Sequence, residues 1–106
     1  DARFNLGNLR LEQGDKAGAI QSYRAMVADN PRHAQALNNL AYLLATDPAA
    51  TEEQAQEALA MAKRALECAE EPDAAMRDTL AKAREARARS ISRDGGTYRN
   101  GAAGRQ

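Results

Sequence analysis

The chain has 106 residues, enough for one small domain, and its 15 basic and 15 acidic side chains cancel. Hydrophobic residues make up 43%, but only 4% of the residues are aromatic, and much of the apolar content is Ala, so the composition favours closely packed helices. The single Cys68 excludes an intramolecular disulfide and a cysteine-based metal cluster, and no apolar run is long enough to span a membrane.

Helical periodicity and helix-breaking residues predict the first two helices. The first covers about residues 2–13 and ends at Gly14, and Asp15 caps a second helix of about residues 16–29. Asn30-Pro31 ends the second helix, because Pro disfavours helical geometry in the residue before it. The apolar residues of this helix recur on one face: Ala19, Ile20, Tyr23, Met26 and Val27.

The next two helices follow from the same signals. A third helix is predicted over about residues 32–45, and its apolar face consists of Leu37, Leu40, Ala41 and Leu44. After a loop, Thr51 and Gln54 have the spacing of a capping box, which predicts the start of a fourth helix over about residues 52–69. Its apolar stripe consists of Ala55, Ala58, Leu59, Ala62, Ala65 and Leu66.

A fifth helix of about residues 74–89 has a short apolar face, which fades where Arg87 comes next in line. This face consists of Met76, Leu80 and Ala83. Beyond about Ser90 the periodicity is lost, and four of the seven glycines gather there, so this segment buries too little surface to offset its ordering entropy. We therefore expect a helical domain over residues 1–90 and a disordered tail containing Gly and Arg over residues 91–106.

The C-terminal end of the chain is basic. From Leu80 onward the only acidic residues are Glu85 and Asp94, and the basic residues are Lys82, Arg84, Arg87, Arg89, Arg93, Arg99 and Arg105. A solvated helix end is the simplest interpretation, because Arg complements the C-terminal end of the helix dipole. Nucleic-acid binding through this end is the other interpretation, but we do not expect it, because Tyr98 alone could stack on bases there.

The chain contains a repeat. Residues 4–9 align with residues 38–43, and Leu6 and Leu40 lie 34 residues apart. The residues of the first unit are Asn5-Leu6-Gly7, Gln13-Gly14-Asp15, Ala19-Ile20, Tyr23 and Asn30-Pro31. In their order and spacing they resemble a tetratricopeptide-repeat (TPR) unit, whose period is also 34 residues. A second unit matches through Leu37, Leu40, Ala41, Leu44, Ala58, Ala62 and Ala65, with about five extra residues in its turn.

The resemblance covers about residues 1–90 and implies an all-α fold. We expect a right-handed, TPR-like solenoid of helical hairpins, with about two repeats and a C-terminal capping helix. It further implies a protein–protein interaction module that binds an extended peptide or a helix in a concave groove. The side chains expected to face this groove are Phe4, Asn8, Leu11, Glu12, Asn38, Asn39, Tyr42, Thr46 and Arg77. Whether the Asn side chains contact a ligand or only fill family positions stays open.

Residues for catalysis are scarce. His33 is the only His, and beside Arg32 at a helix start it is expected to be an exposed polar residue. The acidic pairs at residues 52–53 and 70–71 lack a His or Cys at metal-ligand spacing. We therefore expect no enzyme, no cofactor, no metal and no small-molecule substrate. The expected partner is a protein or peptide; the alternative is a homo-oligomer formed through apolar surface on the unpaired first helix.

Overall fold

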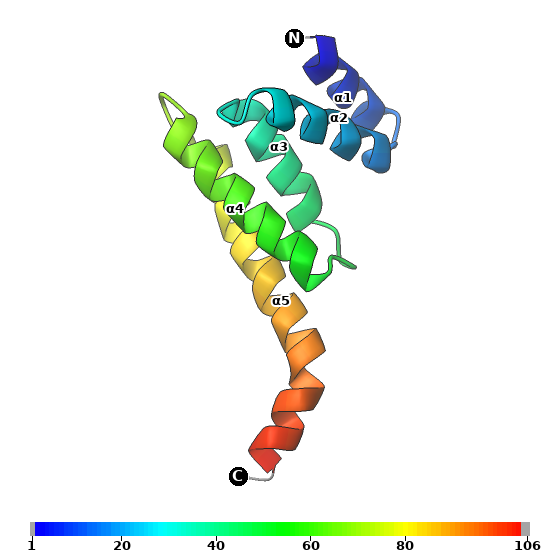
Figure 1. The fold of residues 1–106 in the computed structure, drawn as a ribbon, viewed down its shortest axis with the longest axis vertical. Helices are drawn as coiled ribbons and strands as arrows, with labels where there is room; N and C mark the ends of the chain where they lie inside the picture. The colour runs from blue at the N-terminus through cyan, green and yellow to red at the C-terminus, as the bar shows by residue number, and fades with distance from the viewer. Residues whose placement is uncertain (1, 105–106) are drawn as a thin grey trace.

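The computed structural model describes the backbone of residues 2–104 and the side chains of residues 4–92. This part of the chain is all-α, without a strand (Figure 1). Its helices are α1 (Ala2–Glu12), α2 (Lys16–Asp29), α3 (Ala34–Ala45), α4 (Glu52–Cys68) and α5 (Ala74–Gly104). The five predicted helices are confirmed, and their predicted ends differ from the observed ones by at most two residues everywhere except at the end of α5. No described helix is long and apolar enough to cross a membrane.

The turn between α1 and α2 is built from Gly14 and Asp15. Gly14 has a φ of +82°, a left-handed conformation that glycine adopts without strain. The Gly14 amide donates to Leu11 O (3.0 Å) and the Asp15 amide to Arg10 O (2.8 Å), which is the Schellman pattern at a helix C-terminus. The Asp15 carboxylate then accepts from the Gly18 amide (2.9 Å) and caps α2. The predicted roles of Gly14 and Asp15 are confirmed.

Side chains also cap α3 and α4. His33 Nδ1 accepts from the Ala36 amide (3.1 Å), so α3 begins after His33 rather than at residue 32. The expectation that His33 is a plain exposed residue is wrong, because the side chain is partly buried and is used as a cap. At the start of α4, Thr51 Oγ1 accepts from the Gln54 amide (3.1 Å) and Gln54 Oε1 accepts from the Thr51 amide (2.9 Å). The predicted capping box is confirmed.

Helix α5 differs from expectation in its buried face and in its length. It is capped by Asp73, whose carboxylate accepts from the Met76 amide (2.9 Å). Arg87 is exposed, but the buried face of α5 continues past it, because small side chains occupy the buried positions there. The buried positions are Met76, Thr79, Ala83, Ala86 and Ser90. The helix runs to Gly104, past the expected end near residue 89. Most of the tail at 91–106 lies outside the residues with described side chains, so its disorder stays a prediction.

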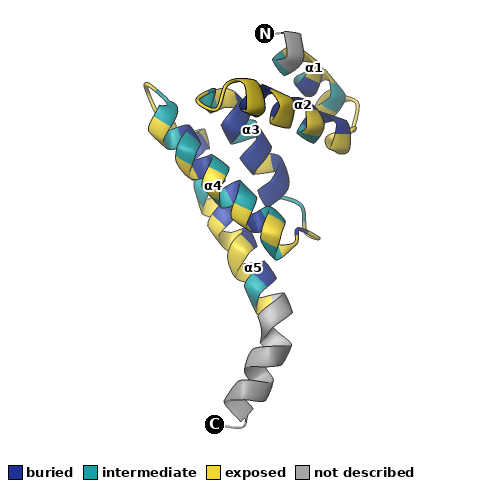
Figure 2. Ribbon diagram, viewed as in Figure 1, coloured by how far each residue is buried: buried dark blue, intermediate teal, exposed yellow. Residues whose placement is uncertain are grey.

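Helix α3 forms the centre of the core. It packs against α2, α4 and α5, and Figure 2 shows that most of its surface is buried. The predicted apolar face of α3 is confirmed, because Leu37, Leu40, Ala41 and Leu44 are all buried. Each of the three Leu side chains stabilises the fold by about 2 kcal/mol through its burial. Helix α4 approaches α3 closely, because its own buried side chains are all small: Ala55, Ala58, Ala62 and Ala65.

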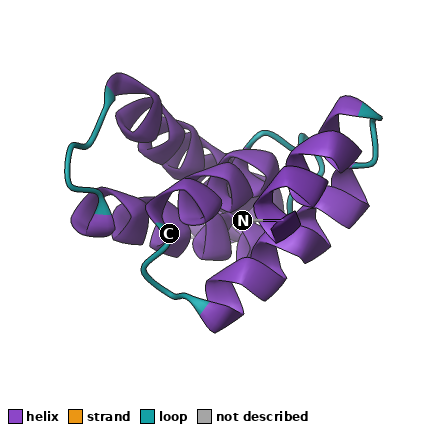
Figure 3. Cartoon of the chain, turned by 90° about the horizontal axis from the view of Figure 1, so that it is seen from above, coloured by secondary structure: helices purple, strands orange, loops and turns teal. Residues whose placement is uncertain are grey.

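The helices form two antiparallel hairpins, α1–α2 and α3–α4, followed by α5, which packs on both α3 and α4 (Figures 1 and 3). Helix α2 joins the hairpins by packing on α3, and Arg24 Nη2 pairs with Glu57 Oε1 of α4 at 2.7 Å. Because both side chains are partly exposed, this ion pair contributes at most about 1 kcal/mol. Helix α1 packs extensively on α2 alone. The arrangement of the hairpins as a TPR solenoid stays a prediction.

Candidate functional site

Two predicted groove residues from different hairpins meet at the hydroxyl group of Tyr23. This side chain projects from α2 and is fully buried. Its hydroxyl donates to Asn8 Oδ1 of α1, and the side chain of Asn39 on α3 lies close enough to the same group to influence its pKa. Burial raises the pKa of Tyr23 above its ordinary value of 10.0, and the side chain of Asn39 acts in the opposite direction. The phenol is therefore protonated at neutral pH and holds Asn8 and Asn39 in place.

Phe4 packs beside this cluster. Its ring lies 5.9 Å from the ring of Tyr23 at an interplanar angle of 56°, and 5.6 Å from the ring of His33 at 23°. Aromatic pairs of this kind contribute about 0.5–1.5 kcal/mol beyond the area that they bury. Phe4 was predicted to face the groove, but its contacts connect α1 to α2 and to the cap of α3. Its main role in this structure is therefore to position the first hairpin.

A second group of predicted residues lies at the C-terminal end of α3. Tyr42 is 44% exposed, and Thr46 Oγ1 donates to Tyr42 O (2.8 Å). Thr46 lines a hollow of about 230 Å³ between α3 and α5, together with Ala45, Lys82, Glu85 and Arg89. Arg89 Nη2 donates to Ala45 O (3.4 Å) across this seam. Thr46 is thus brought against charged side chains of α5.

The α5 residues of this hollow were not predicted as site residues, whereas Arg77 was. Arg77 is exposed, donates to Pro72 O (3.3 Å) and does not line the hollow. The sequence repeat could have identified Lys82. Leu40 and Leu80 lie 40 residues apart, and with the same spacing Tyr42 corresponds to Lys82 and Leu37 corresponds to Arg77. Arg77 therefore corresponds to a packing position of α3, and Lys82 to an exposed one.

The remaining predicted residues are not brought into either group. Leu11 and Glu12 are exposed in the last turn of α1. Asn38 is partly buried, and its Oδ1 atom is buried without a hydrogen-bond partner among the described residues. What the structure does assemble we name the candidate binding face. It consists of Asn8, Asn39, Tyr42 and Thr46, with Lys82, Glu85 and Arg89 across the α3–α5 seam.

This face offers amide, hydroxyl, aromatic and charged groups. Within the described part of the chain, no three His, Cys, Asp or Glu side chains gather in a way that could hold a metal ion. On the same helix, Asn39, Tyr42 and Thr46 are spaced three and four residues apart, so they follow one another along one side of α3. No protein-family model, curated protein or solved structure matches the chain.

Proposed function

We propose that this chain is a protein-interaction module of the TPR type, which binds an extended peptide or a helix along the candidate binding face and catalyses no reaction. The observation that carries the proposal is the convergence of Asn8 and Asn39 on the hydroxyl group of Tyr23. Residues of two hairpins are thereby held side by side. A single ligand can contact both hairpins only if their residues are held in this way. The 34-residue repeat is further support.

The two Asn side chains offer hydrogen-bonding groups to a ligand. Asn8 uses its carbonyl oxygen to accept from Tyr23, so its amide NH₂ is left to donate. The side chain of Asn39 lies beside the same hydroxyl group and carries both a donor NH₂ group and an acceptor carbonyl oxygen. Both side chains are partly exposed. Together they present donor and acceptor groups, which suit the C=O and N–H groups of an extended peptide backbone.

Tyr42 supplies the side-chain contact of this proposal. It is exposed on α3, one helical turn from Asn39, and Tyr is a frequent hot-spot residue in protein interfaces. Because its ring is already on the surface, a ligand gains apolar contact there without any rearrangement of the core. Thr46 and the charged residues of α5 then extend the face along the α3–α5 seam.

The test begins with selection of ligands for the full chain from a display library of random unstructured peptides. For the selected peptides, we expect Tyr42→Ala to raise Kd about 10- to 30-fold, the effect of losing a typical aromatic hot spot. The matched control is Gln56→Ala, which alters an exposed residue of α4 that does not belong to this face and should leave Kd unchanged. Fluorescence anisotropy gives both values. Equal Kd values for the two variants, or a library that yields no ligand, would refute the proposal.

A second candidate function is self-association through α1. Leu6 and Leu9 are 41% and 48% exposed, whereas Leu40 and Leu43, the residues 34 positions later, are 1% and 3% exposed. The difference arises because α3 has three extensive helical neighbours and α1 has one. Adjacent exposed Leu side chains on a helix are typical of an interface. In this alternative, a second copy of the chain covers Leu6 and Leu9.

A further inference from the structure

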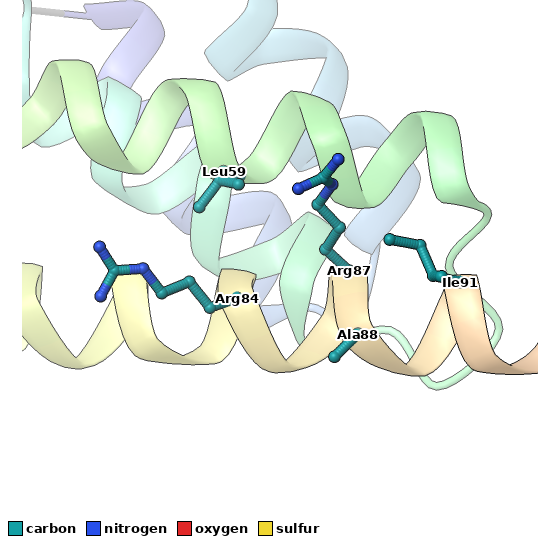
Figure 4. Close-up of a pocket in the computed structure, with 5 residues that line it drawn as sticks. All are labelled: Leu59, Arg84, Arg87, Ala88 and Ile91. Carbon is teal, nitrogen blue, oxygen red and sulfur yellow. The ribbon is translucent and has the colours of Figure 1, made fainter.

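A second hollow lies between α4 and α5, on a different face of α5 from the candidate binding face. Its volume is about 280 Å³, and its lining consists of Leu59 from α4 and Arg84, Arg87, Ala88 and Ile91 from α5. Figure 4 shows that Arg87 and Ile91 reach toward α4, where Leu59 projects toward α5, while Arg84 extends along α5. The hollow thus combines hydrocarbon side chains with two cationic groups.

The two Arg side chains are available to a ligand. Both are exposed, and neither forms a hydrogen bond or ion pair with another residue of the part that the structure describes. Other Arg residues of the chain are engaged: Arg24 pairs with Glu57, and Arg89 donates to Ala45 O. Arg84 and Arg87 are three residues apart, so the two side chains start from neighbouring positions of one helix face.

The hydrocarbon part of the hollow is also partly open. Leu59 and Ile91 are half-buried, and Ala88 is exposed. A volume of about 280 Å³ is below the usual range of small-molecule sites, about 300–1,000 Å³, and suits one or two side chains of a partner. The lining contains no aromatic residue on which a nucleic-acid base could stack. Apolar contact beside guanidinium groups that have no partner in the described part of the chain therefore favours a peptide over a nucleic acid.

We propose that this hollow binds an acidic segment of a protein partner, in which an aliphatic side chain is flanked by carboxylates. The aliphatic side chain packs between Leu59 and Ile91. The carboxylates pair with Arg84 and Arg87, whose planar guanidinium groups match carboxylate geometry with two parallel hydrogen bonds. This site is independent of the candidate binding face, because it uses other residues and requires no peptide there.

The test is a titration of the ¹⁵N-labelled full chain with an acetylated and amidated tetrapeptide of alternating Glu and Leu, followed by NMR. We expect shift changes at the amides of Leu59 and of residues 84–91, and weaker changes when Gln replaces Glu in the peptide. The double substitution Arg84→Gln/Arg87→Gln should raise Kd at least about tenfold, because it removes both charge-assisted pairs. The matched control, Arg32→Gln/Arg77→Gln, removes the same charge from exposed Arg residues outside the hollow and should bind as the wild type does.

Three outcomes would overturn the proposal. Shift changes spread over the surface, or an equal loss of affinity in both double variants, would mean that only overall charge attracts the peptide. If the peptide does not bind to the wild-type chain, the hollow is not a binding site for an acidic segment. A single-stranded oligothymidylate that displaces the peptide and shifts the same amides more strongly would assign the hollow to nucleic acid instead. In every case the dispersion of the spectrum shows whether the variant is folded.

Discussion

At the scale of single residues, Gly7 sets the distance between α1 and α2. A Cβ atom at this position would lie 2.9 Å from Cε1 and 3.1 Å from Cζ of Tyr23. We predict that Gly7→Ala destabilises the fold by about 1–3 kcal/mol, the usual effect of overpacking a core. At a solvent-exposed position in a helix, replacing Gly with Ala stabilises the helix by about 1 kcal/mol. A destabilising effect of Gly7→Ala therefore indicates the contact with Tyr23. Urea unfolding followed by circular dichroism measures it.

A second substitution shows whether Tyr23 is the cause. In a Tyr23→Leu background the ring is gone, so Gly7→Ala should lose most of its destabilising effect in a double-mutant cycle. If Gly7→Ala were as stable as the wild type or more stable, the close approach of the two helices described here would be wrong.

The sequence predicts some residue roles but not others. Gly7 is one of the residues that carry the resemblance to a TPR unit, and its contact with Tyr23 shows why a small residue stands there. The hydroxyl group of Tyr23 has partners on α1 and α3, which come together only after both hairpins have packed. No local pattern carries that information. The cap formed by His33 was missed for a simpler reason: Ser, Thr, Asp and Asn are the residues expected at an N-cap.

At the scale of helices, the caps form a set of local interactions that the sequence largely reveals. Asp73 Oδ1 accepts from the Met76 amide at the start of α5. We predict that Asp73→Ala lowers the free energy of unfolding by about 1 kcal/mol, because an amide in the first turn loses its acceptor. Asp78→Ala in the same helix is the control. It removes only an exposed pair with Lys82 (3.4 Å), which contributes about 0.5 kcal/mol or less. Thermal melts followed by circular dichroism compare the two, and equal losses would rule out the capping role.

Helix starts and helix ends are not equally predictable. The starts of α2 and α4 follow from Asp15 and Thr51, because a cap is a short-range interaction between neighbours in the sequence. The continuation of the buried face of α5 could not be predicted in the same way. It depends on Ala86 and Ser90, whose small side chains give a weak apolar signal and are buried only because α3 and α4 lie close to α5.

At the scale of the whole molecule, the repeat predicts which residues share a face, as long as the repeat is regular. Asn8 and Asn39 were both predicted to face one groove, and the structure brings both to the hydroxyl group of Tyr23. The longer turn between α3 and α4 changes the spacing of the next unit. Arg77 was predicted to face the groove, but it does not line the hollow beside Thr46, whereas Lys82 of α5 does.

The exposure of apolar side chains on α1 is also testable. Leu6 and Leu9 are exposed, whereas their counterparts Leu40 and Leu43 are buried. The double substitution Leu6→Gln/Leu9→Gln should therefore change the free energy of unfolding by no more than about 0.5 kcal/mol.

If α1 is a self-association surface, sedimentation velocity of the wild-type chain shows a fraction of dimer that increases with concentration. The double variant stays monomeric over the same range. The peptide affinity of the candidate binding face should be equal in both proteins. A wild-type chain that is monomeric at every concentration would eliminate self-association, and the exposed Leu pair would then remain uncovered in the free protein.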